Sequence, residues 1–259
     1  MLITNWIHMD ELNRDREIYI WLPDDYESSG KRYPVMYIND GQNAFFDDRS
    51  YSGVSWGFLD YAQQNGREVI LVAIPCNFEP WMREAEYGPW RTGRAITIHE
   101  TGAPGPGLGG EGELYVSFLM NELKPYIDSC FPTIPEDTAI VGSSAGGNIS
   151  MYAALKYPQV FPKCAALSCA FWYYPEQYAA LAQAADLRPL KALYFDHGTN
   201  EGNGNEFVSN LYAYDNEMIR SILMSKEGSD RIHFRIYPGA NHCEPEWRKR
   251  VPVFMELFY

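Results

Sequence analysis

Several short apolar runs in this sequence are continuous rather than alternating with polar residues, and the clearest is VILVAI at residues 69–74. A strand that is buried on both faces has this composition, which is typical of a parallel sheet covered by helices on both sides. Stretches with a helical pattern lie between the runs, so strand and helix alternate along the chain. We therefore predict an α/β fold with a mostly parallel central sheet and helices on both faces. No repeat or linker divides the chain, so we expect one domain over residues 1–259.

The predicted elements follow from these patterns and from the turn residues between them. Seven strands are expected, at residues 16–22, 35–39, 69–74, 138–141, 164–168, 192–195 and 232–237. Five helices are expected, at residues 56–64, 113–128, 147–157, 206–225 and 245–258. The stretch 77–112 is rich in Gly and Pro and has no clear period, so we predict a long loop there, and loops of this length are usually functional.

The charge balance argues against two classes of partner. Lys and Arg number 21 against 34 Asp and Glu, which gives a net charge of −13. A field of this sign repels nucleic-acid phosphates and anionic membrane surfaces. The sequence contains neither an apolar run long enough to span a membrane nor a secretion signal at its start. We predict no nucleic-acid partner, no membrane association and a cytoplasmic location, and leave the oligomeric state open.

The cysteines give no sign of metal or disulfide chemistry. They are odd in number, scattered, and never form a C-x-x-C pair. We expect no metal site and predict buried, reduced thiols at Cys76, Cys130, Cys164, Cys169 and Cys243.

The most specific local pattern is the sequence GSSAG at residues 142–146, which lies between a predicted strand and a predicted helix. This is the nucleophile-elbow pattern, in which a tight turn requires small residues two positions before and two after the serine. Such a turn exposes the Ser144 hydroxyl, and the free N–H groups of the following helix point toward the place where an oxyanion would form. We predict that Ser144 is a catalytic nucleophile; the alternative is a serine in an ordinary glycine-rich turn.

Two later loops contain the partners that such a serine needs. In the α/β-hydrolase order an acid and then a histidine follow the nucleophile, each after a later strand. Glu201 is the leading candidate for the acid and Asp196 is second. His242 is the predicted base, and His197 is its rival. His242 is preferred because it leaves the earlier loop free to supply the carboxylate.

These residues predict acyl transfer through a covalent intermediate. His242 would take the Ser144 proton during attack on an ester carbonyl and return it to the leaving alcohol, while Glu201 orients the imidazole. The oxyanion requires two donors. We predict the backbone N–H of Ala145 and that of Gln42, with Asn43 as a possible replacement for Gln42. No metal and no cofactor are expected to take part.

Beyond the pentapeptide, the sequence resembles the esterase family that includes enterochelin esterases, carbohydrate esterases of family one, feruloyl and acetyl-xylan esterases, and bacterial mycolyltransferases. The resemblance covers nearly the whole chain and implies an α/β-hydrolase fold. The matching stretches are IYIWLPDDY, YPVMYINDGQNAFF, REAEYGPW, GELYVSFLMNELKPYID, IVGSSAGGNISMYAALKYPQVFPK, LSCAFW, HGTNE and GANHCEPEWRKRVPVF.

The resemblance also assigns roles to individual residues. It implies that Ser144 is the nucleophile, that His242 is the histidine of a glycine-x-x-histidine loop, and that Glu201 is the acid, a position where relatives vary between Asp and Glu. Ala145 stands where Met is common in the family, a change that leaves the backbone donor intact.

Aromatic and basic residues outside this set are weaker candidates. In relatives, loops around the acyl or alcohol site contain the positions of Trp56, Trp90 and Trp172, which we predict to bind substrate, with core packing as the alternative. Arg83, Arg91 and Arg94 would attract an anionic substrate or tie loops together. The sequence GPGLGG at residues 105–110 matches a dinucleotide-binding pattern but contains proline and follows no strand, so we predict a flexible loop on the substrate side.

Three classes of function fit the sequence. The first is hydrolysis of a carboxylic ester, an acylated sugar or a small aryl or alkyl ester, with a siderophore ester as an alternative substrate. The second is acyl transfer to an acceptor other than water. The third is a non-catalytic binding module on a hydrolase scaffold. The complete set of serine, histidine and acid favours the first.

Overall fold

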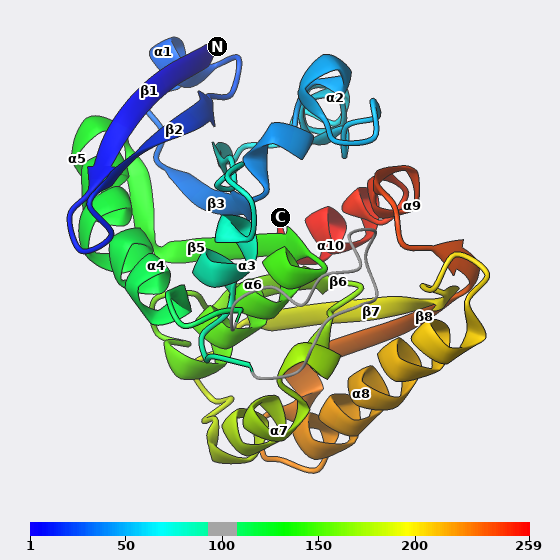
Figure 1. The fold of residues 1–259 in the computed structure, drawn as a ribbon. Helices are drawn as coiled ribbons and strands as arrows, with labels where there is room; N and C mark the ends of the chain where they lie inside the picture. Colours follow the sequence, from blue (N-terminus) through cyan, green and yellow to red (C-terminus); the bar gives the residue numbers. More distant parts are fainter. Residues whose placement is uncertain (93–107) are drawn as a thin grey trace.

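One eight-stranded sheet forms the centre of the computed structural model, which describes residues 1–92 and 108–259 (Figure 1). The strand order is β1-β2-β4-β3-β5-β6-β7-β8. β1 and β2 pair antiparallel, as do β2 and β4, and every other neighbouring pair is parallel. The strands are β1 Leu2–Met9, β2 Arg14–Trp21, β3 Tyr33–Asn39, β4 Ile70–Ile74, β5 Thr133–Ser143, β6 Lys163–Leu167, β7 Ala192–Asn200 and β8 Ile232–Asn241.

Helices cover both faces of the sheet, as predicted. They are α1 Tyr26–Ser29, α2 Phe58–Gln64, α3 Met82–Tyr87, α4 Gly112–Phe118, α5 Lys124–Cys130, α6 Ala145–Lys156, α7 Pro175–Ala184, α8 Glu206–Met224, α9 Glu244–Arg248 and α10 Val251–Phe258. Alternate residues of the central strands contribute to two separate hydrophobic clusters. One cluster joins the sheet to α4, α5, α6, α7 and α8, and the other joins it to α2, α9 and α10 (Figure 1). This two-layer covering confirms the predicted α/β-hydrolase fold.

Three features of the fold differ from the sequence prediction. β1 is an additional strand at the sheet edge, and its residues alternate between exposed and partly buried, so it lacks the continuous apolar run that marks the other strands. α1 and α7 are additional helices. α3 lies inside the stretch that was predicted to be a loop.

Two predicted helices are interrupted. A π-helical turn at Leu119–Leu123 separates α4 from α5. The predicted helix 245–258 is two helices, α9 and α10, and Pro252 lies in the first turn of α10. Proline has no N–H to donate to the preceding turn, so it suits a helix start and not a helix interior. Arg250 lies at the resulting break, and its side chain is buried.

The cysteine prediction is wrong for two of the five thiols. All five are free, but Cys130 is exposed and Cys243 is partly exposed, whereas Cys76, Cys164 and Cys169 are buried. Cys130 is the last residue of α5, where the amphipathic helix turns its polar side to solvent. Among the described residues, no helix is both long enough and apolar enough to span a membrane.

We expect a thiol reagent to modify Cys130 rapidly in the native protein and the three buried cysteines only after unfolding. The thiolate is the reactive form, and burial raises the pKa of the Cys76 thiol to about 12 and raises the pKa of Cys164 and Cys169 as well. The measurement is a time course of thiol release in native and denatured protein. Cys130→Ser should lower the number of thiols that react in the fast phase by one, leaving at most the partly exposed Cys243, and an unchanged number would contradict the assignment.

Candidate active site

Ser144 lies in the turn between β5 and α6 with a strained backbone. Its φ of 55° and ψ of −123° lie in a region that non-glycine residues rarely occupy, at a cost on the order of 1–3 kcal/mol. Its backbone N–H donates to the carbonyl of Leu167 in β6 at 2.8 Å, which holds the turn against the sheet. Ser144 is partly exposed, whereas its neighbours Ser143 and Ala145 are buried. The turn therefore presents one hydroxyl at the carboxyl end of the parallel strands.

Two glycines make this turn sterically possible. A Cβ atom on Gly142 would lie 2.2 Å from the carbonyl oxygen of Gly146, so the end of β5 and the start of α6 approach closely only without a side chain there. A Cβ atom on Gly146 would lie 2.7 Å from Oδ2 of Asp40, in the loop after β3. The small residues that the sequence pattern requires are thus explained by close contact on both sides of Ser144.

His242 and Glu201 form a hydrogen-bonded pair at the ends of two neighbouring strands. Nδ1 of His242 lies 2.6 Å from Oε2 of Glu201. Glu201 follows β7 and His242 follows β8, and these strands pair in parallel, so their carboxyl ends meet at the same edge of the sheet. The Glu201 side chain is fully buried, and that of His242 is 11% exposed.

Glu201 is arranged to remain ionised. Burial alone raises the pKa of its carboxyl, but the hydrogen bond and the charge of His242, with hydrogen bonds from Ser168 and Gly198, outweigh burial and lower the pKa below its ordinary value. A buried carboxylate with these partners orients the imidazole and stabilises the imidazolium that forms during acyl transfer.

Tyr212 of α8 connects the nucleophile to the histidine. Its ring centroid lies 5.0 Å from that of His242, and the tyrosine is buried. Burial is the main reason that the pKa of its hydroxyl is raised, and a hydrogen bond with the Ser144 hydroxyl opposes that rise. Tyr212 therefore lies close to both Ser144 and His242.

Within residues 1–92 and 108–259, the two predicted oxyanion donors are unpaired. Gln42 lies in a short 3₁₀ turn, Gly41–Asn43, directly after β3, and Ala145 is the first residue of α6. Among the described residues, neither the Gln42 nor the Ala145 backbone N–H donates to a protein acceptor. The Gln42 side chain anchors the turn, because its Oε1 accepts the Cys76 N–H at 3.0 Å. By contrast, the Asn43 N–H donates to the Asp40 carbonyl at 2.8 Å, so it is not free to bind an oxyanion.

The alternative acid and base have other partners. Asp196 is buried within β7, where Oδ1 accepts a hydrogen bond from Arg250 at 2.5 Å and Oδ2 accepts one from Tyr194 at 2.7 Å. His197 is also buried, and its Nδ1 lies 2.8 Å from the Gly198 carbonyl. The structure therefore brings Glu201, and not Asp196, to His242.

The three predicted substrate-binding tryptophans lie in different surroundings. Trp172 is buried in a small hydrophobic cluster with Tyr212, so it adjoins the residue that contacts Ser144. Trp56 is fully buried, and its ring packs 6.1 Å from that of Trp247. Trp90 is partly buried among three tyrosines, the nearest being Tyr178 at 5.1 Å. The structure places only Trp172 beside Tyr212, and a substrate contact for each of the three stays a prediction.

The three arginines of the irregular stretch also differ in their surroundings. Arg83 binds Asp40 with two hydrogen bonds of 2.7 Å, so it ties α3 to the loop after β3. Arg91 is exposed and lies against Gly110. Arg94 lies outside the described residues, as does the first half of the GPGLGG stretch, residues 105–107.

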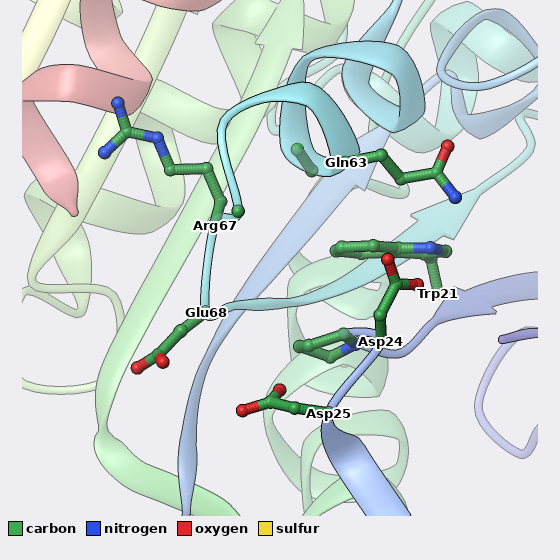
Figure 2. Close-up of a pocket in the computed structure, with 9 residues that line it drawn as sticks. Trp21, Asp24, Asp25, Gln63, Arg67 and Glu68 are labelled. Carbon is green, nitrogen blue, oxygen red and sulfur yellow. The ribbon is translucent and has the colours of Figure 1, made fainter.

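A surface cavity of about 240 Å³ lies away from these residues, around Trp21 (Figure 2). Trp21 pairs with Leu71 near the start of β4, so this cavity lies at the amino end of that strand, whereas Ser144, Glu201 and His242 follow the carboxyl ends of theirs. Its lining includes Asp24, Asp25 and Glu68 but no serine, cysteine or histidine, and so it provides no nucleophile.

Sequence reasoning missed four residues that surround the proposed acid and base. Ser168, Trp247 and Arg250 form hydrogen bonds on the far side of Glu201, and Tyr212 contacts His242. One signal was accessible, because Ser168 lies at the carboxyl end of a predicted strand, where catalytic residues of this fold are found. Arg250 lies in the basic run WRKR, which reads as a solvated helix face.

Comparison with known proteins gives a family match over most of the chain. A family model described as "Putative esterase" matches residues 9–255. The uncharacterized protein YbbA of Bacillus subtilis is 26% identical over 249 residues, which is 95% of this chain and 93% of YbbA.

Solved structures give the same fold. An IroE-like serine hydrolase from Shewanella oneidensis superposes with a TM-score of 0.78 at 21% identity, covering all of this chain and 80% of that one. The siderophore hydrolase EstA from Aspergillus nidulans superposes with a TM-score of 0.75 at 17% identity, covering all of this chain and 95% of that one. At these identities the likeness concerns the fold.

Proposed function

This chain belongs to the esterase family, so its reaction is the hydrolysis of a carboxylic ester, and we propose that Ser144, His242 and Glu201 carry it out as nucleophile, general base and orienting acid. The observation that carries the proposal is the 2.6 Å contact between His242 and Glu201, at the same end of the parallel strands as a strained and partly exposed Ser144. A positioned acid, base and nucleophile are the groups that acyl transfer requires.

The proposed reaction has two halves. His242 accepts the Ser144 proton while Oγ attacks the ester carbonyl, and the oxyanion that forms is bound by the N–H groups of Ala145 and Gln42. His242 then donates the proton to the leaving alcohol, which leaves an acyl group on Ser144. Water, activated by the same histidine, attacks the acyl-enzyme and releases the acid. Glu201 stays ionised throughout and stabilises the imidazolium.

The surroundings of Ser144 favour an uncharged aryl or alkyl ester, or an acylated sugar, as the substrate. Tyr212 belongs to a buried apolar cluster that also contains Trp172, Leu108 and Val208. Aromatic side chains of this kind bury apolar groups and also stack on planar ones. The net charge of −13 does not attract anions.

A siderophore ester is the second candidate substrate, because the superposed structures include an IroE-like serine hydrolase and a siderophore hydrolase. Ferric siderophores are anionic, and Arg83 is neutralised by Asp40. Rates of hydrolysis on a small aryl ester, an acylated sugar and a siderophore ester, measured side by side, distinguish the two candidates.

Labelling with a fluorophosphonate tests the triad directly. We expect one adduct per chain, mapped by peptide mass spectrometry to Ser144, and we expect His242→Ala to slow labelling by at least about 100-fold because the general base is lost. His233→Ala is the matched control, since His233 is a partly buried histidine of β8. Labelling at another residue, or labelling that His242→Ala leaves unchanged, would rule out the proposed triad.

A further inference from the structure

A set of buried polar side chains lies on the side of Glu201 that faces away from His242. Its members, which we call the Ser168 network, are Ser168, Asp196, Trp247 and Arg250. All four are buried, and Arg250 is only 1% exposed although it carries a full charge. Burying such groups is costly unless each is paired, so their arrangement requires an explanation.

The Ser168 hydroxyl has one possible orientation. A hydroxyl has one donor and two acceptor positions. Nε1 of Trp247 lies 3.0 Å from Oγ, and Nη1 of Arg250 lies 2.8 Å from it. Indole and guanidinium nitrogens only donate, so they occupy both acceptor positions. The remaining proton must point to Oε1 of Glu201, which lies 2.6 Å away.

The backbone of Ser168 is also constrained. Its φ is 47°, in the left-handed region, and its N–H donates to both the carbonyl and Oδ1 of Asp196, at 3.0 and 3.1 Å. Backbone strain at a buried serine persists only where the surroundings enforce it, and it concentrates at functional sites. Here the strained turn places Oγ against the carboxylate of Glu201.

Arg250 supplies the charge that this arrangement needs. It donates to Oδ1 of Asp196 and to Oγ of Ser168, and its guanidinium lies over the Tyr237 ring at 4.7 Å. Two buried carboxylates, Asp196 and Glu201, therefore share one guanidinium, which binds Asp196 directly and reaches Glu201 only through Ser168. One negative charge is left over, and the imidazolium of His242 is the group that balances it during the reaction.

Trp247 joins the two sides of Glu201. Its indole N–H holds Ser168, and its ring packs edge-on against His242 with 4.9 Å between centroids. The same side chain thus fixes the hydroxyl behind the carboxylate and the imidazole in front of it.

We propose that Ser168 is a positioning residue for the ester hydrolysis and that, with Arg250 and Trp247, it fixes the orientation of Glu201 so that Oε2 faces Nδ1 of His242. This inference rests on the proposed function, because it assigns a partner to the proposed acid. It predicts that removal of the Ser168 hydroxyl impairs the chemical step without changing any group that touches the substrate.

The test compares Ser168→Ala with wild type in steady-state kinetics. Alanine and serine are equally strained at a φ of 47°, so this change isolates the hydroxyl. A hydrogen bond to a charged group is lost, and we expect kcat to fall about 10- to 100-fold while KM changes less than about twofold. Ser168→Gly lacks the hydroxyl and tolerates the positive φ, so it keeps the test decisive if Ser168→Ala folds poorly.

A pH profile separates positioning from packing. The charged and titratable groups around Glu201 are His242, Asp196 and Arg250, with Tyr212 and Cys169 within electrostatic reach. Without the Ser168 proton, more negative charge faces His242, and its imidazolium is stabilised. The acid limb of kcat/KM should therefore move to higher pH in Ser168→Ala, which a packing defect would not cause. Ser150→Ala is the control, because Ser150 is a buried serine that donates to Gly146 at 2.7 Å and does not contact Glu201. The acid limb of kcat/KM for Ser150→Ala should stay at the same pH as in wild type.

Glu201→Gln distinguishes failure of this inference from failure of the proposed function. If Glu201→Gln is impaired and Ser168→Ala matches wild type in kcat and pH profile, Ser168 does not position the acid and the inference is overturned while the triad stands. If Glu201→Gln itself keeps wild-type activity, the proposed acid is wrong and the inference loses its premise.

Discussion

Ser144→Ala is expected to abolish ester hydrolysis while leaving the fold intact. Loss of Oγ removes the atom that bonds to the acyl group, and removal of the nucleophile in a serine protease lowers kcat by roughly 10⁶-fold. Residual catalysis would come from the oxyanion donors alone. Stability should change little, because alanine is as strained as serine at a φ of 55° and Ser144 is partly exposed. The measurement is turnover of a small aryl ester, with thermal unfolding in parallel.

Ser143→Ala is the matched control for this experiment. Ser143 is the neighbouring residue at the end of β5 and is buried, so the same atom is removed one position away. We expect its kcat to remain within a few-fold of wild type. Turnover by Ser144→Ala at more than about one-hundredth of the wild-type rate would mean that a different residue is the nucleophile.

The parts of the fold that could be predicted are those buried on both faces. β4 has the sequence ILVAI and is fully buried, so its continuous apolar composition was enough to predict a central strand. β1 was missed because it lies at the edge and half of its side chains face solvent. Pro252 accounts for the break between α9 and α10, but the burial of Arg250 at that break was missed because the sequence shows a basic run there rather than a buried charge.

The candidate site, like the fold, could be predicted only in part from the sequence. Ser144, Glu201 and His242 could be proposed because each follows a strand and the order of these residue types is a known pattern. The choice between Glu201 and Asp196 depended on which carboxylate faces the histidine, and that follows from the register of β7 on β8. Ser168 and Trp247 act through hydrogen bonds to residues 33 and 79 positions away along the chain, and no local pattern reports such contacts.

Gly41→Ala is expected to lower kcat by about 10²- to 10³-fold, the effect of losing one oxyanion donor. An added Cβ atom would lie 2.2 Å from the Ile74 nitrogen and 2.5 Å from the Ala73 carbonyl carbon. Both are backbone atoms of β4, so they cannot move aside and the turn must shift instead. The adjacent Gln42 N–H then leaves its place. Because this donor acts on the transition state, KM should change little while kcat falls.

The comparison with Gly66→Ala separates this effect from a general loss of stability. Gly66 has a positive φ, and no atom lies within 4 Å of its added Cβ, so alanine there costs about 1–2 kcal/mol of strain without moving any part of the site. Gly66→Ala should lower the free energy of unfolding and keep wild-type kcat. If folded Gly41→Ala also keeps wild-type kcat, the turn after β3 does not supply the second donor, and the oxyanion must be bound by Ala145 with some other group.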